Sequence, residues 1–156
     1  MPLAERNNLV LDYLTESNAE SVAPLFMKSF HTYEYFQRMM PDTAQAAKAW
    51  TEATQHAIND PDTICLAVTD ISTGAIVAHG RWVRPKAEGE KDQPGNEEDR
   101  WGDGFMEACD SNMAEDLFGA FHKNREQFMG EEKHWCKYLL LSESPMFVLL
   151  ASPGFI

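Results

Sequence analysis

The alternation of apolar and polar positions along the chain predicts four β-strands. The plainest signal lies at residues 63–69, where β-branched and apolar residues lead into a turn that contains Gly74, and residues 75–83 return with the same character. Two such runs on either side of a glycine turn favour an antiparallel hairpin. Residues 8–13 and 134–141 carry shorter strand patterns.

A spacing of three to four residues between apolar positions predicts three helices. The first follows the capping side chains of residues 15–18 and runs to Phe30, with Pro24 inside it as a kink or a delayed start. The second covers residues 43–57. The third covers residues 105–128, and Gly130 is placed to end it.

The remaining segments are connectors. Residues 31–40 form an aromatic, methionine-rich link between the first two helices, and residues 84–103 form a long, acidic loop with several glycines and prolines. The order strand, helix, helix, strand, strand, loop, helix, strand predicts an α/β (α+β) fold with a largely antiparallel sheet flanked by helices. A length of 156 residues predicts a single domain, residues 1–156.

Charge and cysteine usage narrow the function classes. A net charge of -12 argues against nucleic acid and against anionic membrane surfaces, because both need clustered Lys and Arg. The cysteines are odd in number and far apart, which predicts neither a disulfide framework nor a zinc site: Cys65, Cys109 and Cys136. Reduced thiols, and no apolar stretch in residues 1–8, predict an intracellular, cytoplasmic protein without a secretory signal.

Several segments, taken in order, resemble the N-terminal part of the GNAT family of acyl-CoA N-acyltransferases, especially the group common in fungi. Residues 16–30 are similar to the first helix of that family, residues 65–78 to its second and third strands, and residues 129–135 to the approach to its fourth strand. Trp82 follows where that group often has an aromatic residue. The resemblance covers roughly residues 8–141 and leaves residues 142–156 as a divergent tail.

The resemblance implies acetyl transfer from acetyl-CoA, as co-substrate, to a small-molecule or peptide amine. In the family, the fourth strand leads into an R/Q-x-x-G-x-G/A loop, whose backbone N–H groups at a helix N-terminus hold the CoA pyrophosphate. Residues 142–156 contain no Lys, no Arg and one glycine, Gly154, and prolines interrupt them. The fold is therefore expected to be incomplete at its C-terminus and the chain to be inactive alone.

Two groups of residues are candidates for the site that the resemblance implies. The backbone of Leu139, Leu140 and Leu141 is placed to face the thioester, although the same residues fit an apolar core strand. The connector supplies the acceptor-side candidates Tyr33, Glu34, Tyr35 and Phe36. These aromatics beside a carboxylate suit an amine, and they equally suit closing the core over the sheet.

Other titratable residues have simpler interpretations. Carboxylates on the third helix could act as a base, but a solvated acidic face is the favoured interpretation: Glu107, Asp110, Glu115 and Asp116. His79 and His134 flank strands and are more often structural than catalytic. No catalytic residue is assigned, and the histidines lack the spacing of metal ligands.

Two alternatives to a diverged, inactive acetyltransferase remain. A sheet that lacks its later strands leaves an exposed edge, which would suit a non-catalytic interaction module that associates with itself through this edge or through the apolar residues 146–151. A frameshift or retained intron after Trp135 would also make the sequence similarity to the family stop abruptly at that point.

Overall fold

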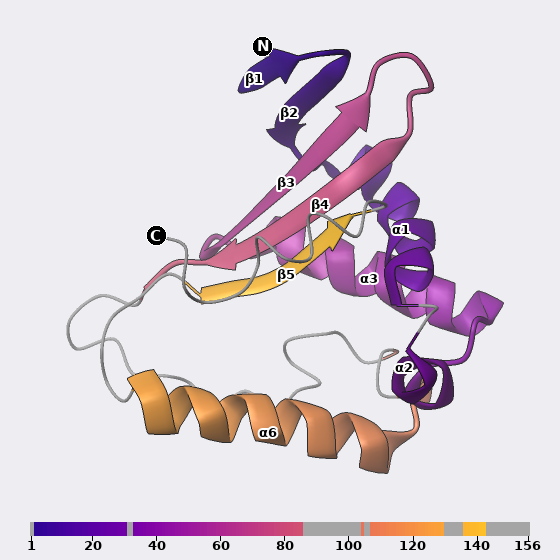
Figure 1. Cartoon of the computed structure of the whole chain (residues 1–156), viewed down its shortest axis with the longest axis vertical. Helices are drawn as coiled ribbons and strands as arrows, with labels where there is room; N and C mark the ends of the chain where they lie inside the picture. The colour runs from indigo at the N-terminus through magenta and orange to yellow at the C-terminus, as the bar shows by residue number, and fades with distance from the viewer. Residues whose placement is uncertain (1, 31–32, 86–103, 105–106, 130–135, 143–156) are drawn as a thin grey trace.

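The computed structural model describes residues 2–30, 33–85, 104, 107–129 and 136–142. Within these residues the strands form one five-stranded sheet in the order β1-β2-β3-β4-β5, and every neighbouring pair is antiparallel (Figure 1). The strands are β1 (Ala4–Arg6), β2 (Leu9–Tyr13), β3 (Thr63–Asp70), β4 (Ile76–Val83) and β5 (Cys136–Ser142). The four predicted strands and the mixed α+β fold with a largely antiparallel sheet are confirmed.

Strand β1 was not predicted, although the sequence carries its turn signal. Asn7 and Asn8 both have positive φ, 51° and 63°. Two positive values are what a two-residue type I′ hairpin turn requires, and asparagine tolerates this region better than most residues. The Asn-Asn pair therefore folds β1 back onto β2.

The first helical region is split in two by its sequence. A 3₁₀ helix, η1 (Glu16–Ser21), begins at Thr15, whose N–H donates to Asn18 Oδ1 at 2.8 Å. The α-helix α1 (Val22–Phe30) follows, so Pro24 lies in its first turn, where a missing N–H costs no intrahelical bond. The delayed helix start expected from Pro24 is confirmed.

Helix α3 (Ala44–Asn59) matches its prediction, and Thr43 Oγ1 caps it by accepting from the Ala46 N–H at 3.1 Å. The connector between α1 and α3 contains a helix that was not predicted, α2 (Glu34–Met39). Helix α6 (Ser111–Met129) begins later than expected, because Asp110 Oδ1 accepts from the Met113 N–H and starts the helix there. Most of the predicted acidic loop, residues 86–103, lies outside the described residues.

The core lies between one face of the sheet and the helices α1 and α3 (Figure 1). Cys65 and Ala67 of β3 point into it, and Trp50 from α3 lies at its centre. Phe118 of α6 packs against this core, whereas Phe121 of the same helix is 60% exposed. Among the described helices, none combines the length and the apolar character needed to cross a bilayer.

Two glycines should respond oppositely to alanine. Gly119 lies inside α6, and an added Cβ would meet no atom within 4 Å, so Gly119→Ala should stabilise the fold by about 1 kcal/mol through helix propensity. Gly74 ends the β3–β4 turn at φ +72°, so Gly74→Ala should destabilise it by about 1–2 kcal/mol. Denaturant melts of both variants test this, and equal shifts of the same sign would contradict it.

Candidate functional site

An aromatic cluster joins α1, α2 and α3 at the side of the core. Phe26 of α1 contacts Trp50 of α3, with ring centroids 3.4 Å apart, and Phe30 stacks on Phe36 of α2 at 4.3 Å and 26°. The indole Nε1–H of Trp50 points at Met40 Sδ, 2.7 Å away. The cluster forms because one face of α1 presents aromatic residues four positions apart, Phe26 and Phe30, to both neighbouring helices.

A pocket opens on this cluster between α1 and the segment around α2. Its walls are aromatic and thioether groups, and two polar side chains, Gln37 and Asp42, stand among them; the full lining is Phe26, Met27, Phe30, Phe36, Gln37, Met40 and Asp42. Asp42 is exposed. The cavity volume is only about 20 Å³, room for little more than a water molecule, so these walls form a shallow apolar notch beside one exposed carboxylate.

The structure separates the four acceptor-side candidates. Phe36 lines the pocket, whereas Tyr33 is 53% exposed and Glu34 is exposed. Tyr35 points toward α6, where its hydroxyl donates to the Met113 carbonyl oxygen at 2.6 Å. A six-residue helix turns successive side chains in different directions, so a contiguous sequence run does not become a contiguous surface.

The cofactor-side candidates lie on β5, the last strand of the sheet. Leu139, Leu140 and Leu141 pair with Arg81, Gly80 and His79 of β4. The register shifts between Arg81 and Trp82, which is the mark of a β-bulge. Within the described part of the chain no strand pairs with the outer side of β5, so alternate backbone groups of these leucines point away from the sheet.

Two polar side chains of β4 are buried beneath the helices. His79 is 3% exposed and Arg81 is 7% exposed. His79 Nδ1 lies 3.0 Å from the Leu66 carbonyl oxygen, and since a carbonyl can only accept, Nδ1 carries the proton. Burial, with a smaller contribution from the Arg81 charge, lowers the pKa of His79 to about 4, so the imidazole is neutral at pH 7.

Neither Cys65 nor Cys109 has the character of a nucleophile. Burial raises the pKa of the Cys65 thiol, and burial raises the pKa of Cys109 to about 12. A thiol needs a lowered pKa and access to solvent to react at neutral pH.

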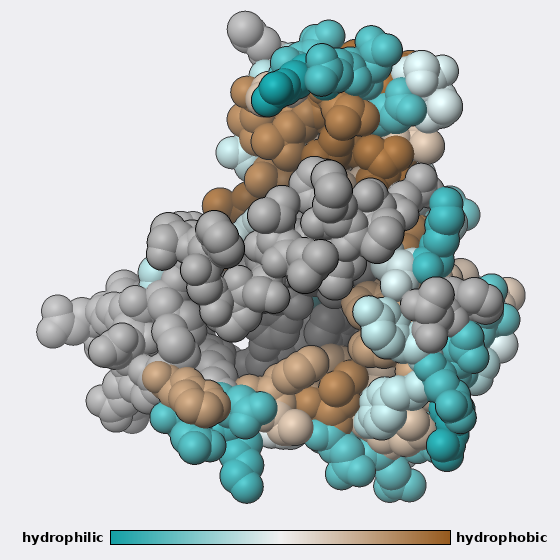
Figure 2. Space-filling model, in the orientation of Figure 1, coloured by the Kyte–Doolittle hydropathy of each residue, from teal (hydrophilic) through white to brown (hydrophobic). Residues whose placement is uncertain are grey.

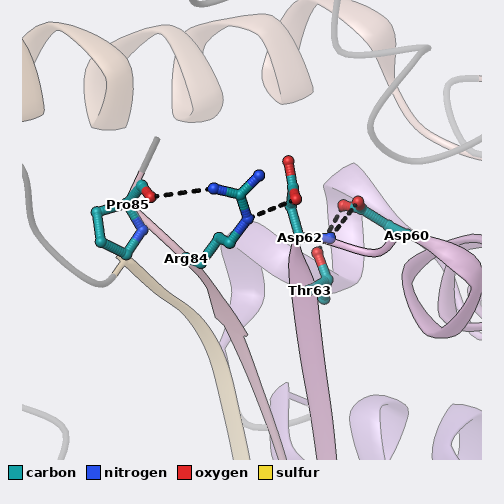
Figure 3. Close-up of polar contacts among 5 residues, drawn as sticks. All are labelled: Asp60, Asp62, Thr63, Arg84 and Pro85. Carbon is teal, nitrogen blue, oxygen red and sulfur yellow. Dashed lines mark hydrogen bonds and ion pairs between the residues drawn. The ribbon is translucent and has the colours of Figure 1, made fainter. Parts of the chain in front are cut away.

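The clearest polar network links two neighbouring strands of the sheet. Asp60 accepts from the Asp62 N–H at 2.9 Å and from Thr63 Oγ1 at 2.6 Å, and Arg84 Nε donates to Asp62 Oδ1 at 2.6 Å (Figure 3). These contacts join the start of β3 to the end of β4. Among the residues that the structure describes, no three His, Cys, Asp or Glu side chains come together as a metal site would need.

The acidic candidates of the third helix fall at its exposed positions. Asp110 is the helix cap described above, and Glu107, Glu115 and Asp116 are exposed. His134 lies outside the described residues. Neither Asp42 nor Phe30 was predicted as a site residue. Asp42 carried a signal in the sequence, because the pair Pro41-Asp42 comes directly after the aromatic connector.

Comparison with known proteins leaves the family open. No family model matches the chain, and no curated protein matches it. It is similar to the crystal structure of a ribosomal-protein-S5-alanine acetyltransferase from Vibrio fischeri, with 14% sequence identity and a TM-score of 0.41 over 54% of this chain and 48% of that one. The similarity spans about half of each chain, and at this score it does not establish a shared activity.

Proposed function

We propose that the chain is an acetyltransferase-like domain of the GNAT kind. In this proposal the outer edge of β5 faces an acetyl thioester, and the pocket beside α2 faces the amine. The observation that carries it is the place of β5, which is the last strand of the sheet within the described residues, contains a bulge, and stands at the point in the chain order that the sequence resemblance gives to the cofactor strand. The proposed similarity to the fungal members of this family rests on the sequence resemblance alone.

The chemistry asks little of side chains. The amine nitrogen attacks the thioester carbonyl, the C–N bond forms and the C–S bond breaks, a proton leaves the amine, and the departing thiolate takes up a proton. Backbone N–H groups of Leu139–141 on the open edge would hydrogen-bond the developing oxyanion. Asp42 would attract the protonated amine to the aromatic pocket. We assign neither the base nor the acid.

The proposal includes weak cofactor binding by this chain alone. A pyrophosphate is held by several backbone N–H groups or basic side chains that converge on it. Residues 142–156 contain no Lys or Arg and no R/Q-x-x-G-x-G/A sequence, and the chain carries a net charge of -12, which repels a polyanion. The nucleotide half of acetyl-CoA should therefore add no affinity. An intracellular protein, as expected from its thiols, would meet acetyl-CoA.

A paired titration tests this proposal. Acetyl-CoA and acetyl-pantetheine carry the same thioester, but only the first carries the diphosphate and nucleotide. We expect calorimetry or ligand-detected NMR to give both a measurable dissociation constant of about 1 mM, within about threefold of each other. An affinity for acetyl-CoA about 100-fold above that for acetyl-pantetheine would show that a cradle exists. Binding of neither would remove the acyltransferase proposal.

A second function is favoured by the same open strand. Among the described residues no strand pairs with the outer side of β5, and such an edge can accept a strand from a partner, which would make the chain a non-catalytic interaction module. Amide hydrogen exchange of β5 discriminates between the two. Protection that rises with chain concentration supports the module, and protection that does not depend on concentration counts against it.

A further inference from the structure

The sheet has a second apolar face, away from α1 and α3. Side chains alternate along a strand, and Cys65 and Ala67 point into the core, so their neighbours Leu66 and Val68 point the other way. Leu11 and Tyr13 are their partners on β2 and share that direction. The outer face is defined here as Leu9, Leu11, Tyr13, Leu66 and Val68.

Two residues of the outer face are exposed, and the other three, Leu11, Leu66 and Val68, are half-buried. Leu9 is 39% exposed and Tyr13 is 56% exposed, and Leu9, Leu11 and Val68 line a shallow pocket beside the hairpin. Figure 2 shows hydrophobic residues gathered at the end of the sheet where β1 and β2 lie. A sheet that is apolar on both faces is normally covered on both, and a contiguous exposed apolar patch marks an interaction site.

Charge on this face indicates what covers it. Arg6, Leu9 and Asp70 are register partners across β1, β2 and β3, so they form one row with a cation at one end, an apolar side chain in the middle and an anion at the other end. A twofold axis along β2 would place β3 of a second copy over β1. Arg6 would then face Asp70 of the second copy, and Asp70 would face its Arg6, across sheets about 10 Å apart.

We propose that two copies of this chain associate face to face through the outer face, about a twofold axis that runs along β2. The row is complementary to itself under that operation, which is the requirement for an isologous dimer. Stacked sheets with nearly aligned strands are a common packing, and leucines and a tyrosine would interdigitate at its centre. This interface is independent of the proposed acetyl transfer and of the β5 edge.

Sedimentation velocity of the full chain tests the proposal. We expect the wild-type chain to form a dimer whose fraction rises with concentration up to about 1 mM. Leu9→Asp should make the protein monomeric, and because Leu9 is 39% exposed in the single chain, the substitution should leave the fold intact. A wild-type chain that stays monomeric throughout, or a dimer that Leu9→Asp leaves unchanged, would overturn the proposal.

Reversing the charges of Arg6 and Asp70 tests the proposed twofold axis along β2. Arg6→Asp alone would oppose Asp with Asp, and Asp70→Arg alone would oppose Arg with Arg, so each should weaken its own dimer at least about tenfold. Asp70 Oδ1 also accepts from the Ser72 N–H at 2.8 Å and from the Ser72 hydroxyl at 2.6 Å in the β3–β4 turn, so the circular dichroism of Asp70→Arg is first matched to that of the wild type. A mixture of the two variants should form a heterodimer, because every contact is then complementary. Glu20→Arg is the control, since it makes the same charge change as Asp70→Arg at an exposed position of η1, on the side of the sheet that carries the helices, and should leave the dimer intact. Failure of the mixed variants to associate would overturn the assigned axis.

Discussion

Trp50→Ala should destabilise the fold by about 3–5 kcal/mol, the largest loss expected from a single core substitution in this chain. Trp50 is 3% exposed, its ring lies 3.4 Å from that of Phe26, and its Nε1–H has Met40 Sδ as a partner. Truncation removes the contact between α1 and α3 and leaves a cavity where the aromatic cluster meets the sheet. Because small domains are stable by about 5–15 kcal/mol in total, a large part of the stability would be lost.

Urea unfolding, followed by circular dichroism, measures this loss. Phe128→Ala is the matched control: it also removes an aromatic ring, but Phe128 is 77% exposed, so the change in the free energy of unfolding should stay within about 0.5 kcal/mol. Equal costs for the two variants would mean that Trp50 is not at the centre of the core.

His79 should make the stability of the protein fall in mild acid. The unfolded pKa is 6.5 and the folded pKa is about 4, because burial disfavours the imidazolium. Between these pH values the unfolded chain binds the proton and the folded chain does not, so stability is fully present above about pH 6.5 and is lost as the pH falls toward 4. The lowering from 6.5 to about 4 corresponds to about 3 kcal/mol.

The contribution of His79 to the pH dependence of stability is isolated by comparing His79→Gln with the wild type. His79→Gln keeps a donor for the Leu66 carbonyl but does not titrate, so its free energy of unfolding should fall by about 3 kcal/mol less than that of the wild type between pH 7 and pH 4. Parallel profiles for the wild type and His79→Gln would contradict the assigned burial.

The sequence predicted strands and helices well where one local signal dominated. Residues 63–83 combine β-branched runs with a glycine turn, and Thr43 supplies a cap that fixes where α3 begins. The start of α6 was misplaced because Met106 and Cys109 continue the helical spacing, whereas the cap at Asp110 decides where the helix begins. Strand β1 was missed because its three residues are too few to show an alternation.

The candidate site was less predictable because it depends on tertiary contacts. The run from Tyr33 to Phe36 has uniform character in sequence, yet α2 sends Phe36 to the pocket and Tyr35 to α6. The position of β5 at the sheet edge follows from its pairing with β4 across more than fifty residues of chain, which no local pattern encodes. The burial of His79 likewise depends on how the helices cover the sheet.

Backbone amide NMR of the full chain during addition of acetyl-pantetheine would locate the thioester on the sheet without requiring a diphosphate site. We expect chemical-shift changes concentrated at Leu139, Leu140 and Leu141, with the same pattern and midpoint when acetyl-CoA replaces the fragment. Shifts confined to other strands, or a much lower midpoint for acetyl-CoA, would contradict this expectation.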